Sequence, residues 1–164
     1  MKIALACDHA GYEQLKELKL YLESLGHQCD NYGPSSFQPD DDYPAYIAVA
    51  AKAVASGHCE RGIILGGSGQ GEAMAANRFK GVRCTVFYGP AVPKRLVGAE
   101  HRQTHDAYEI IHLSRRDNNA NMPSLSGWFV SLAEMQQVIK LWLETPFSDE
   151  ERHARRNQQL DEVS

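Results

Sequence analysis

The sequence has few cysteines and no pattern that would use them as a group. Its four cysteines lie far apart in the chain, and no CxxC pair is present. Such spacing excludes the paired thiols of a zinc ribbon or a redox dithiol and gives no sign of a disulfide framework. We expect reduced thiols of a cytoplasmic protein, packed mainly in its core. The four are Cys7, Cys29, Cys59 and Cys84.

Long hydrophobic runs and an excess of basic residues are also missing. The apolar stretch at the N-terminus is too short for a signal peptide, and no run approaches the length of a membrane span. The formal net charge is −4, which argues against non-specific nucleic-acid binding. We therefore expect neither a membrane nor a nucleic acid as a partner. With 43% apolar and 23% charged residues, the chain has the composition of a single globular domain over residues 1–164.

Three familiar ligand-binding signatures are absent. The glycines of 66–71 lack the dinucleotide spacing, because Gly71 comes one residue too early, and no lysine follows where a P-loop requires one. His101 and His105 have helical spacing, but the glutamate of the zinc-protease pattern does not follow His101, and no third ligand is evident. We predict no metal and no cofactor.

The stretch from Arg61 to Phe79 carries the strongest functional signal. An apolar run, 62–65, precedes a glycine-rich segment, 66–72, and an alanine-rich segment of high helix propensity. This order predicts a strand, a glycine loop and a helix. Because glycines have no Cβ atom, successive backbone N–H groups stay free to surround an anion. The loop is typical of an oxyanion or phosphate cradle.

Glu72 is the unusual residue of this loop. A carboxylate beside an anion-binding set of amides repels the anion unless the carboxylate takes or gives a proton. A base next to an oxyanion cradle indicates enolisation chemistry. The alternative is structural, since glycine turns after strands are common and an acidic residue in the first helical turn complements the helix dipole.

Strands and helices alternate along most of the chain. Strands are predicted over Ile3–Cys7, His27–Tyr32 and Val82–Tyr88 in addition to 62–65. Helices are predicted over Tyr12–Leu25, Tyr43–Ala55, Leu132–Leu143 and Ser148–Leu160, besides the one after the glycine loop. Alternating elements with short connections imply an α/β fold, with a parallel sheet covered by helices on both faces.

The pattern is ambiguous in the later part of the chain. It predicts a helix over Ala91–Ala99 and a strand over Tyr108–Ser114, but the residues between them are polar. An extended surface loop over 91–117 therefore stays open as an alternative. Residues 148–164 are expected to form a C-terminal helix and tail.

Two separate stretches are expected at one edge of the sheet. Asp8 and His9 follow the first strand, and the loop 66–72 follows another. Ligands of parallel α/β sheets bind beyond the carboxyl ends of the strands, so these residues should share one site; the alternative for Asp8 and His9 is an exposed turn. Arg152 and Arg156 project from one side of the last helix and suit a phosphate, although a solvated face paired with acidic neighbours is the simpler interpretation.

Five short motifs follow one another over nearly the whole chain: Cys7–Gly11, Asp42–Pro44, Gly66–Asn77, Asn118–Asn121 and Arg152–Arg156. Each is weak alone, but the ordered set resembles the type B ribose-5-phosphate isomerase family, which includes galactose-6-phosphate and allose-6-phosphate isomerases. The resemblance implies a Rossmann-like fold with a five-stranded parallel sheet in three layers. It also implies a dimer or higher assembly with sites shared between subunits, a sugar phosphate as substrate, and no cofactor.

The resemblance further implies roles for the matching residues. Glu72 would move a proton between the two carbons of a cis-enediolate, whose oxygen the Ser68 hydroxyl and the backbone around Gly67 would hold. Asp8 would contact sugar hydroxyls, and His9, Arg152 and Arg156 would contact the phosphate. Further substrate-binding positions are Tyr43, Gly67, Gly69, Gly71, Asn77 and Asn118.

Two positions depart from the family pattern. Asp117 stands where the family has a histidine that opens the furanose ring, and an Asp is a poorer acid and base near neutral pH. We hypothesise that Asp117 itself, with a raised pKa, or else His101 or His105, takes that role. Trp128 replaces an arginine, which removes a phosphate contact and adds an aromatic face. The change at Trp128 leaves open a related pentose or hexose phosphate in place of ribose-5-phosphate as the substrate. Both departures leave a non-catalytic sugar-phosphate-binding or scaffold protein as the alternative function.

Overall fold

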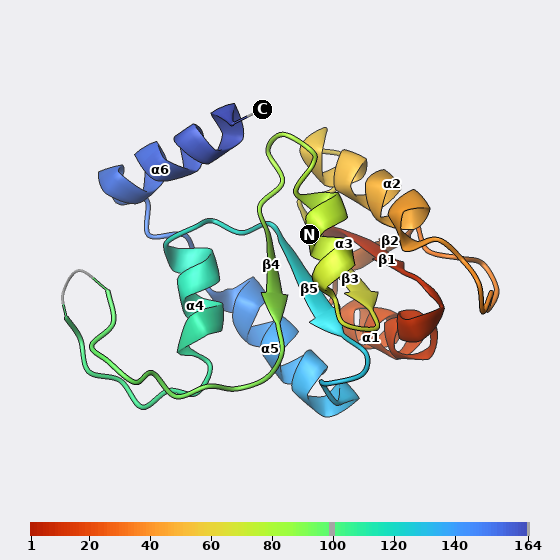
Figure 1. Cartoon of the computed structure of the whole chain (residues 1–164), viewed down its shortest axis with the longest axis horizontal. Helices are drawn as coiled ribbons and strands as arrows, with labels where there is room; N and C mark the ends of the chain where they lie inside the picture. The colour runs from red at the N-terminus through yellow and green to blue at the C-terminus, as the bar shows by residue number, and fades with distance from the viewer. Residues whose placement is uncertain (99–100, 164) are drawn as a thin grey trace.

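A computed structural model describes residues 1–98 and 101–163 and has a five-stranded parallel sheet at its centre, in the order β2-β1-β3-β5-β4 (Figure 1). The strands are β1 (Lys2–Cys7), β2 (Gln28–Asn31), β3 (Arg61–Gly66), β4 (Cys84–Phe87) and β5 (Met122–Ser126). The helices are the 3-10 turn η1 (His9–Gly11), α1 (Tyr12–Ser24), α2 (Tyr43–Ala55), α3 (Gln70–Ala76), α4 (Glu109–Arg116), α5 (Leu132–Glu144) and α6 (Glu151–Glu162). The predicted α/β fold is confirmed.

Helices cover both faces of the sheet, which explains why its inner strands are apolar throughout. Along β1, Ile3 and Leu5 pack with α1, α4 and α5, whereas Ala4 and Ala6 pack with α2 and α3. All four side chains are fully buried. The polar strand β2 lies at an edge of the sheet, as predicted. Of the helices that the structure describes, none is both long and apolar enough to cross a bilayer.

The start of α5 shows how local sequence determines an element. The Ser131 hydroxyl accepts a hydrogen bond from the Glu134 backbone N–H at 3.3 Å, and the Glu134 carboxylate accepts one from the Ser131 N–H at 3.0 Å. This capping box satisfies two N–H groups that a helix start leaves without partners. The helix predicted from Leu132 is therefore confirmed.

The predicted strand over Tyr108–Ser114 is wrong. These residues start α4, with Ile111, Ser114 and Arg115 buried at helical spacing. The strand that completes the sheet is β5, whose sequence Met-Pro-Ser-Leu-Ser has little strand propensity. Its two serines are nevertheless fully buried, because they hydrogen-bond to the glycine loop described below.

The predicted helix over Ala91–Ala99 is also wrong for the residues that the structure describes, and Ala99 itself lies outside them. The chain leaves β4, runs out as an extended arm and returns to α4 (Figure 1). Hydrogen bonds from the Ala91 N–H to the Ala107 carbonyl at 2.7 Å and between Val97 and Arg102 hold the two sides of the arm together. Pro90 and Pro93 suit an extended chain rather than a helix.

Candidate active site

The glycine loop connects β3 to α3, and two serine side chains of β5 hold it by hydrogen bonds. The Ser126 hydroxyl donates a hydrogen bond to the Gly67 carbonyl at 2.6 Å, and the Ser124 hydroxyl donates one to the Gly69 carbonyl at 2.7 Å. Gly69 has a φ of +76°, a left-handed conformation that a side chain would strain. The loop is thus held in one shape before any ligand binds.

Two donors of this loop are free. The backbone N–H groups of Gly67 and Ser68 make no hydrogen bond within the described part of the chain. Ser68 is only partly buried, and its hydroxyl accepts a weak hydrogen bond from the Gln70 N–H at 3.3 Å. Adjacent N–H groups of this kind can bind an oxyanion.

The Glu72 side chain lies against this loop. It is 4% exposed, and its carboxyl group packs on Gly66 so closely that a Cβ atom there would overlap it. Burial raises the pKa of Glu72 above its ordinary value, and the negative charge of Asp8 adds to the rise, while hydrogen bonds from the Glu72 and Gly69 backbone oppose it. A carboxyl group with a raised pKa is suited to accept and return a proton near neutral pH.

Asp8 and His9 emerge from β1 beside this loop, as predicted. Asp8 is buried and accepts a hydrogen bond from the Ala10 N–H at 2.9 Å, which caps η1. The Nδ1 atom of His9 lies 2.8 Å from the Oδ1 atom of Asp41. That hydrogen bond, more than the nearby negative charges, raises the pKa of His9. Asp41 is not among the predicted site residues, and its only signal in the sequence is its place among three consecutive aspartates.

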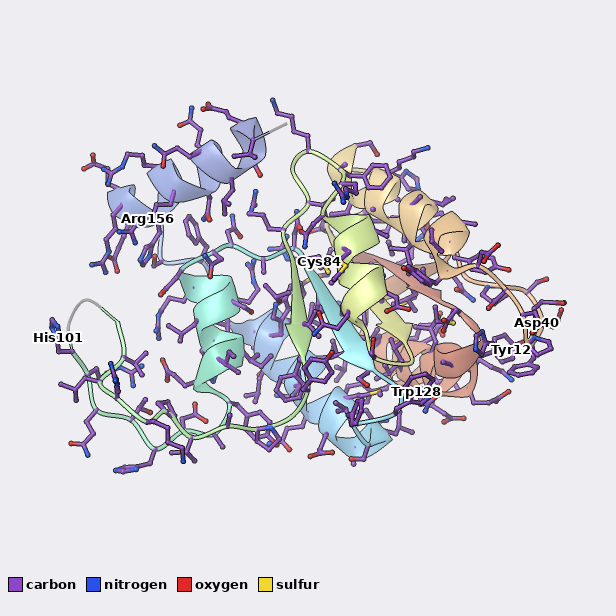
Figure 2. The ribbon with its side chains drawn as sticks, viewed as in Figure 1. Tyr12, Asp40, Cys84, His101, Trp128 and Arg156 are labelled. Atoms are coloured by element: carbon purple, nitrogen blue, oxygen red, sulfur yellow. The ribbon has the colours of Figure 1, made fainter. Side chains whose placement is uncertain are left out.

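Tyr43 and Trp128 border the same loop. The Tyr43 hydroxyl lies against Gly71, where an added Cβ would come within 2.5 Å of it. The indole ring of Trp128 lies on Gly67, where an added Cβ would come within 2.6 Å of the ring. Trp128 is nevertheless 70% exposed, and Figure 2 shows it near the carboxyl ends of the strands.

The remaining predicted residues lie at the opposite end of the strands, where the strands begin. Asp117 and Asn118 precede β5, and the Asp117 carboxylate accepts a hydrogen bond from the Arg116 side chain at 3.2 Å. Arg152 forms an ion pair with Glu150 at 2.6 Å, and Arg156 is exposed on α6, far from Trp128 in Figure 2. These residues do not meet Glu72 within one chain.

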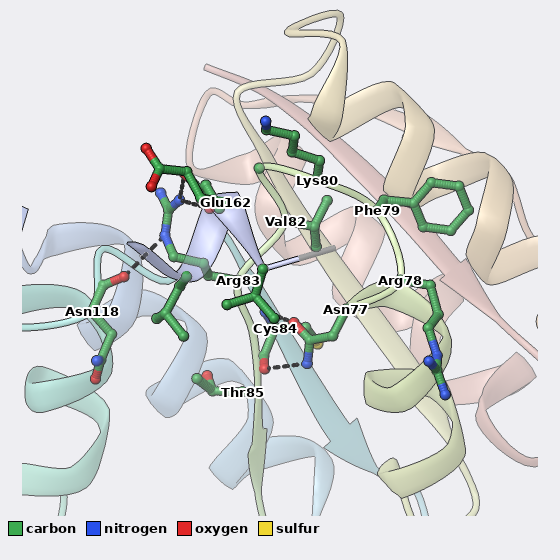
Figure 3. A pocket seen from close by; sticks show the side chains of 14 residues that line it. Asn77, Arg78, Phe79, Lys80, Val82, Arg83, Cys84, Thr85, Asn118 and Glu162 are labelled. Atoms are coloured by element: carbon green, nitrogen blue, oxygen red, sulfur yellow. Dashed lines mark hydrogen bonds and ion pairs between the residues drawn. The ribbon is translucent and has the colours of Figure 1, made fainter. Parts of the chain in front are cut away.

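The side-chain amide of Asn77 makes structural hydrogen bonds within the chain. Its side-chain amide donates to the Cys84 carbonyl at 3.0 Å and its oxygen accepts from the Cys84 N–H at 2.8 Å, which joins α3 to β4. Asn77 and Asn118 line a cavity of about 740 Å³ between α6 and the start of β4 (Figure 3). Glu72 is not among its lining residues.

The two histidines of the arm do not approach Glu72 in the same chain. His101 and His105 are both exposed, and His101 has a left-handed backbone with a φ of 49°. Figure 2 shows His101 at the far end of the arm, away from Trp128 and the glycine loop. A role for either in opening a sugar ring at this Glu72 would need a second copy of the chain.

Among the residues that the structure describes, two groups of side chains offer ligand atoms within 4.8 Å of one another, as a metal site requires. They are Asp8, His9 and Asp41 at the glycine-loop edge, and Asp30, His58 and Cys59 at the opposite edge. In the first group His9 and Asp41 already bond to each other. In the second, the Lys2 ammonium lies 2.9 Å from the Asp30 carboxylate and 2.7 Å from the His58 ring.

Comparison with known proteins identifies the family. The model of the ribose/galactose isomerase family matches residues 3–160. The chain belongs to this family. A ribose-5-phosphate isomerase B of Mycolicibacterium paratuberculosis is 34% identical over 156 residues, covering 95% of this chain and 87% of that protein. The enzyme of the same name from Escherichia coli is 30% identical over 142 residues, covering 87% and 83%.

Solved structures of the ribose/galactose isomerase family have the same fold. The ribose-5-phosphate isomerase B of Clostridium thermocellum superposes with a TM-score of 0.84 at 29% identity, covering 99% of this chain and 97% of that one. That of Mycoplasma genitalium, solved with bound ribulose-5-phosphate, has a TM-score of 0.83 at 27% identity, covering 98% and 94%. The predicted resemblance and the predicted class, a sugar-phosphate isomerase, are confirmed.

Proposed function

We propose that the chain interconverts an aldose phosphate and a ketose phosphate through a cis-enediolate, with Glu72 as the base. Ribose-5-phosphate and ribulose-5-phosphate, or a related pentose or hexose phosphate, are the substrates. The observation that carries this proposal is the buried Glu72 carboxyl beside the free N–H groups of Gly67 and Ser68. The bound ribulose-5-phosphate in the Mycoplasma genitalium structure supports the substrate class.

In the proposed reaction, these groups move a proton between two neighbouring carbons of the sugar. Glu72 removes the proton from the carbon next to the carbonyl, and the electron pair of that C–H bond forms the carbon–carbon double bond of the enediolate. The oxygen that gains negative charge accepts hydrogen bonds from the Gly67 and Ser68 N–H groups and from the Ser68 hydroxyl. Each such donor contributes about 10²–10³-fold to rate. The hydroxyl proton on the neighbouring oxygen moves to the charged oxygen, and Glu72 returns its proton to the former carbonyl carbon. The neighbouring oxygen thereby becomes the new carbonyl, which completes the isomerisation.

The proposal includes a homodimer or tetramer with sites shared between subunits. In one chain, Asp8, His9, Tyr43 and Glu72 lie at the carboxyl edge of the sheet. The phosphate-binding arginines of the family pattern, Arg152 and Arg156, and the ring-opening position Asp117 lie at the other edge. A second copy packed in the opposite direction would complete both sites.

We also propose that the chain is a single domain that acts in a reducing cytoplasm. The four free cysteines fit such a compartment.

Subunit mixing tests the shared site. Glu72→Gln removes the base and Arg156→Ala removes a phosphate contact, so each variant alone should have little activity. After mixed refolding, a dimer with shared sites regains one intact site per heterodimer, which amounts to roughly a quarter of wild-type activity. If both residues act from the same chain, the mixture stays inactive. A screen of pentose and hexose phosphates with the wild-type protein identifies the substrate.

A sugar-phosphate-binding or scaffold protein is the second candidate. It is favoured by Asp117 at the ring-opening position and by Trp128 in place of a cation. A scaffold protein binds sugar phosphates in the same screen but converts none of them, in open-chain or cyclic form. Turnover of an open-chain substrate alone would assign the defect to ring opening.

A further inference from the structure

The loop in front of α2 places one buried carboxylate behind His9. The Asp41 side chain is 5% exposed, and its Oδ1 atom accepts two hydrogen bonds from His9, one from the backbone N–H at 3.1 Å and one from Nδ1 at 2.8 Å. Its other oxygen, Oδ2, is buried and has no hydrogen-bond partner within the described part of the chain. A buried carboxylate with so few partners is costly unless a positive charge compensates it.

The hydrogen bonds of Asp41 determine how the His9 ring is oriented. Because a carboxylate only accepts, Nδ1 carries a proton, and Nε2 is the atom left for other contacts. The His9 side chain is 36% exposed, so Nε2 is available to a ligand. When Nε2 is also protonated, the ring presents a positively charged N–H donor.

Within the described part of the chain, the charged groups that act on His9 are acidic. Asp8 precedes it at the end of β1, and Asp40 and Asp41 face it from the loop before α2. Without a charged His9, this end of the site would repel a phosphate dianion. The ring can attract the phosphate only in its imidazolium form, which the buried partner favours.

We propose that Asp41 is a positioning residue that holds His9 with Nδ1 protonated and Nε2–H directed at the phosphate of the substrate. This inference rests on the proposed function, because His9 is taken to contact the phosphate there. Asp41 itself touches no substrate. The hydrogen-bond geometry, the burial of the carboxylate and its unpaired oxygen carry the proposal.

Two asparagine variants separate the effect of the hydrogen bond between Asp41 and His9 from the effect of a nearby negative charge alone. Asp41→Asn keeps the shape of the side chain but removes the charge that favours the imidazolium. Asp40→Asn, one residue earlier and exposed, removes the same charge from the same loop without breaking a contact to His9. We expect Asp41→Asn to raise KM for the sugar phosphate about 10-fold, the loss of one charge-assisted hydrogen bond, with kcat nearly unchanged. Asp40→Asn should change KM less than about twofold.

The pH dependence provides the specific signature. In the wild type, KM should rise with increasing pH as His9 loses its proton, and in Asp41→Asn this rise should begin at a lower pH. In a His9→Gln background, Asp41→Asn should have no further effect on KM. Equal KM values for Asp41→Asn and Asp40→Asn, or an unshifted pH profile, would overturn the proposal.

A measurement without turnover keeps this test independent of the isomerase assignment. The titration of the His9 ring is followed by NMR, with inorganic phosphate as the ligand. The proposal requires a lower pKa of His9 and weaker phosphate binding in Asp41→Asn, and a clearly smaller change of both in Asp40→Asn, whose charge acts on His9 without a hydrogen bond. An unchanged pKa of His9 in Asp41→Asn contradicts the positioning role. If the expected shifts occur in a protein that isomerises no sugar phosphate, the positioning role holds and the proposed function fails.

Discussion

The close fit between Gly66 and Glu72 makes Gly66→Ala an informative substitution. A Cβ atom at position 66 would overlap the Glu72 carboxyl group, with Oε2 only 2.6 Å away. The backbone of Gly66 is not left-handed, so alanine is excluded by the carboxyl group and not by its φ angle. The carboxyl group must move away from the loop, and a displaced general base loses about 10²–10⁴-fold in rate.

The same overlap has a stability cost that can be isolated. Forcing one methyl group into a packed site costs about 1–3 kcal/mol, and here the crowded partner is a single side chain. Gly66→Ala should therefore lower the free energy of unfolding by that amount in the wild type. In a Glu72→Ala background it should cost less than about 0.5 kcal/mol, because the space is empty.

Chemical denaturation of the four proteins and an isomerase assay of Gly66→Ala measure both effects. Near-wild-type turnover of Gly66→Ala would show that the Glu72 carboxyl group is not needed at its observed position. An equal loss of stability in both backgrounds would show that the methyl group meets the backbone and not Glu72. Either result would contradict the proposed clash between a Cβ atom at position 66 and a catalytically required Glu72 carboxyl group.

Three further predictions concern stability. Because burial raises the pKa of Glu72, its ionised form destabilises the folded protein; Glu72→Gln should be more stable than the wild type, and thermal melts from about pH 4 to about pH 8 should show the difference growing as pH rises. Ser131→Ala removes the hydroxyl that caps α5 against Glu134 and should cost about 1 kcal/mol in urea unfolding, with KM unchanged. Asp161→Asn weakens the ion pair at 2.8 Å between Asp161 and Arg83, which ties α6 to the residue before β4, and faster amide hydrogen exchange confined to α6 would detect its release.

The regular part of the fold could be predicted because periodicity reflects burial. The strand over Ile3–Cys7 is apolar on both faces because helices cover both, and the helix from Leu132 has a complete capping box. No local pattern predicts β5, because its two serines are buried by their hydrogen bonds to the glycine loop, a contact between distant segments. The two adjacent isoleucines within Tyr108–Ser114 favour a strand, and a short apolar run does not distinguish a strand from a buried helix.

The site was predictable to the extent that sheet topology determines it. Asp8, His9 and the glycine loop share an edge because parallel strands end together. The role of Asp41 could not be predicted, because its burial depends on how its loop folds back against His9, just after β1. Arg152 and Arg156 lie at the other edge, and a single sequence does not reveal which copy of the chain supplies a residue to a site.

Exchange of solvent deuterium into an open-chain sugar phosphate tests the central claim most directly, because it reports proton transfer at carbon whether or not the ring can be opened. If Glu72 is the base, the wild-type protein incorporates deuterium at the carbon next to the carbonyl, and Glu72→Gln, with its fold intact, does not. Exchange that survives in Glu72→Gln, or no exchange by the wild type with any pentose or hexose phosphate, would contradict that claim.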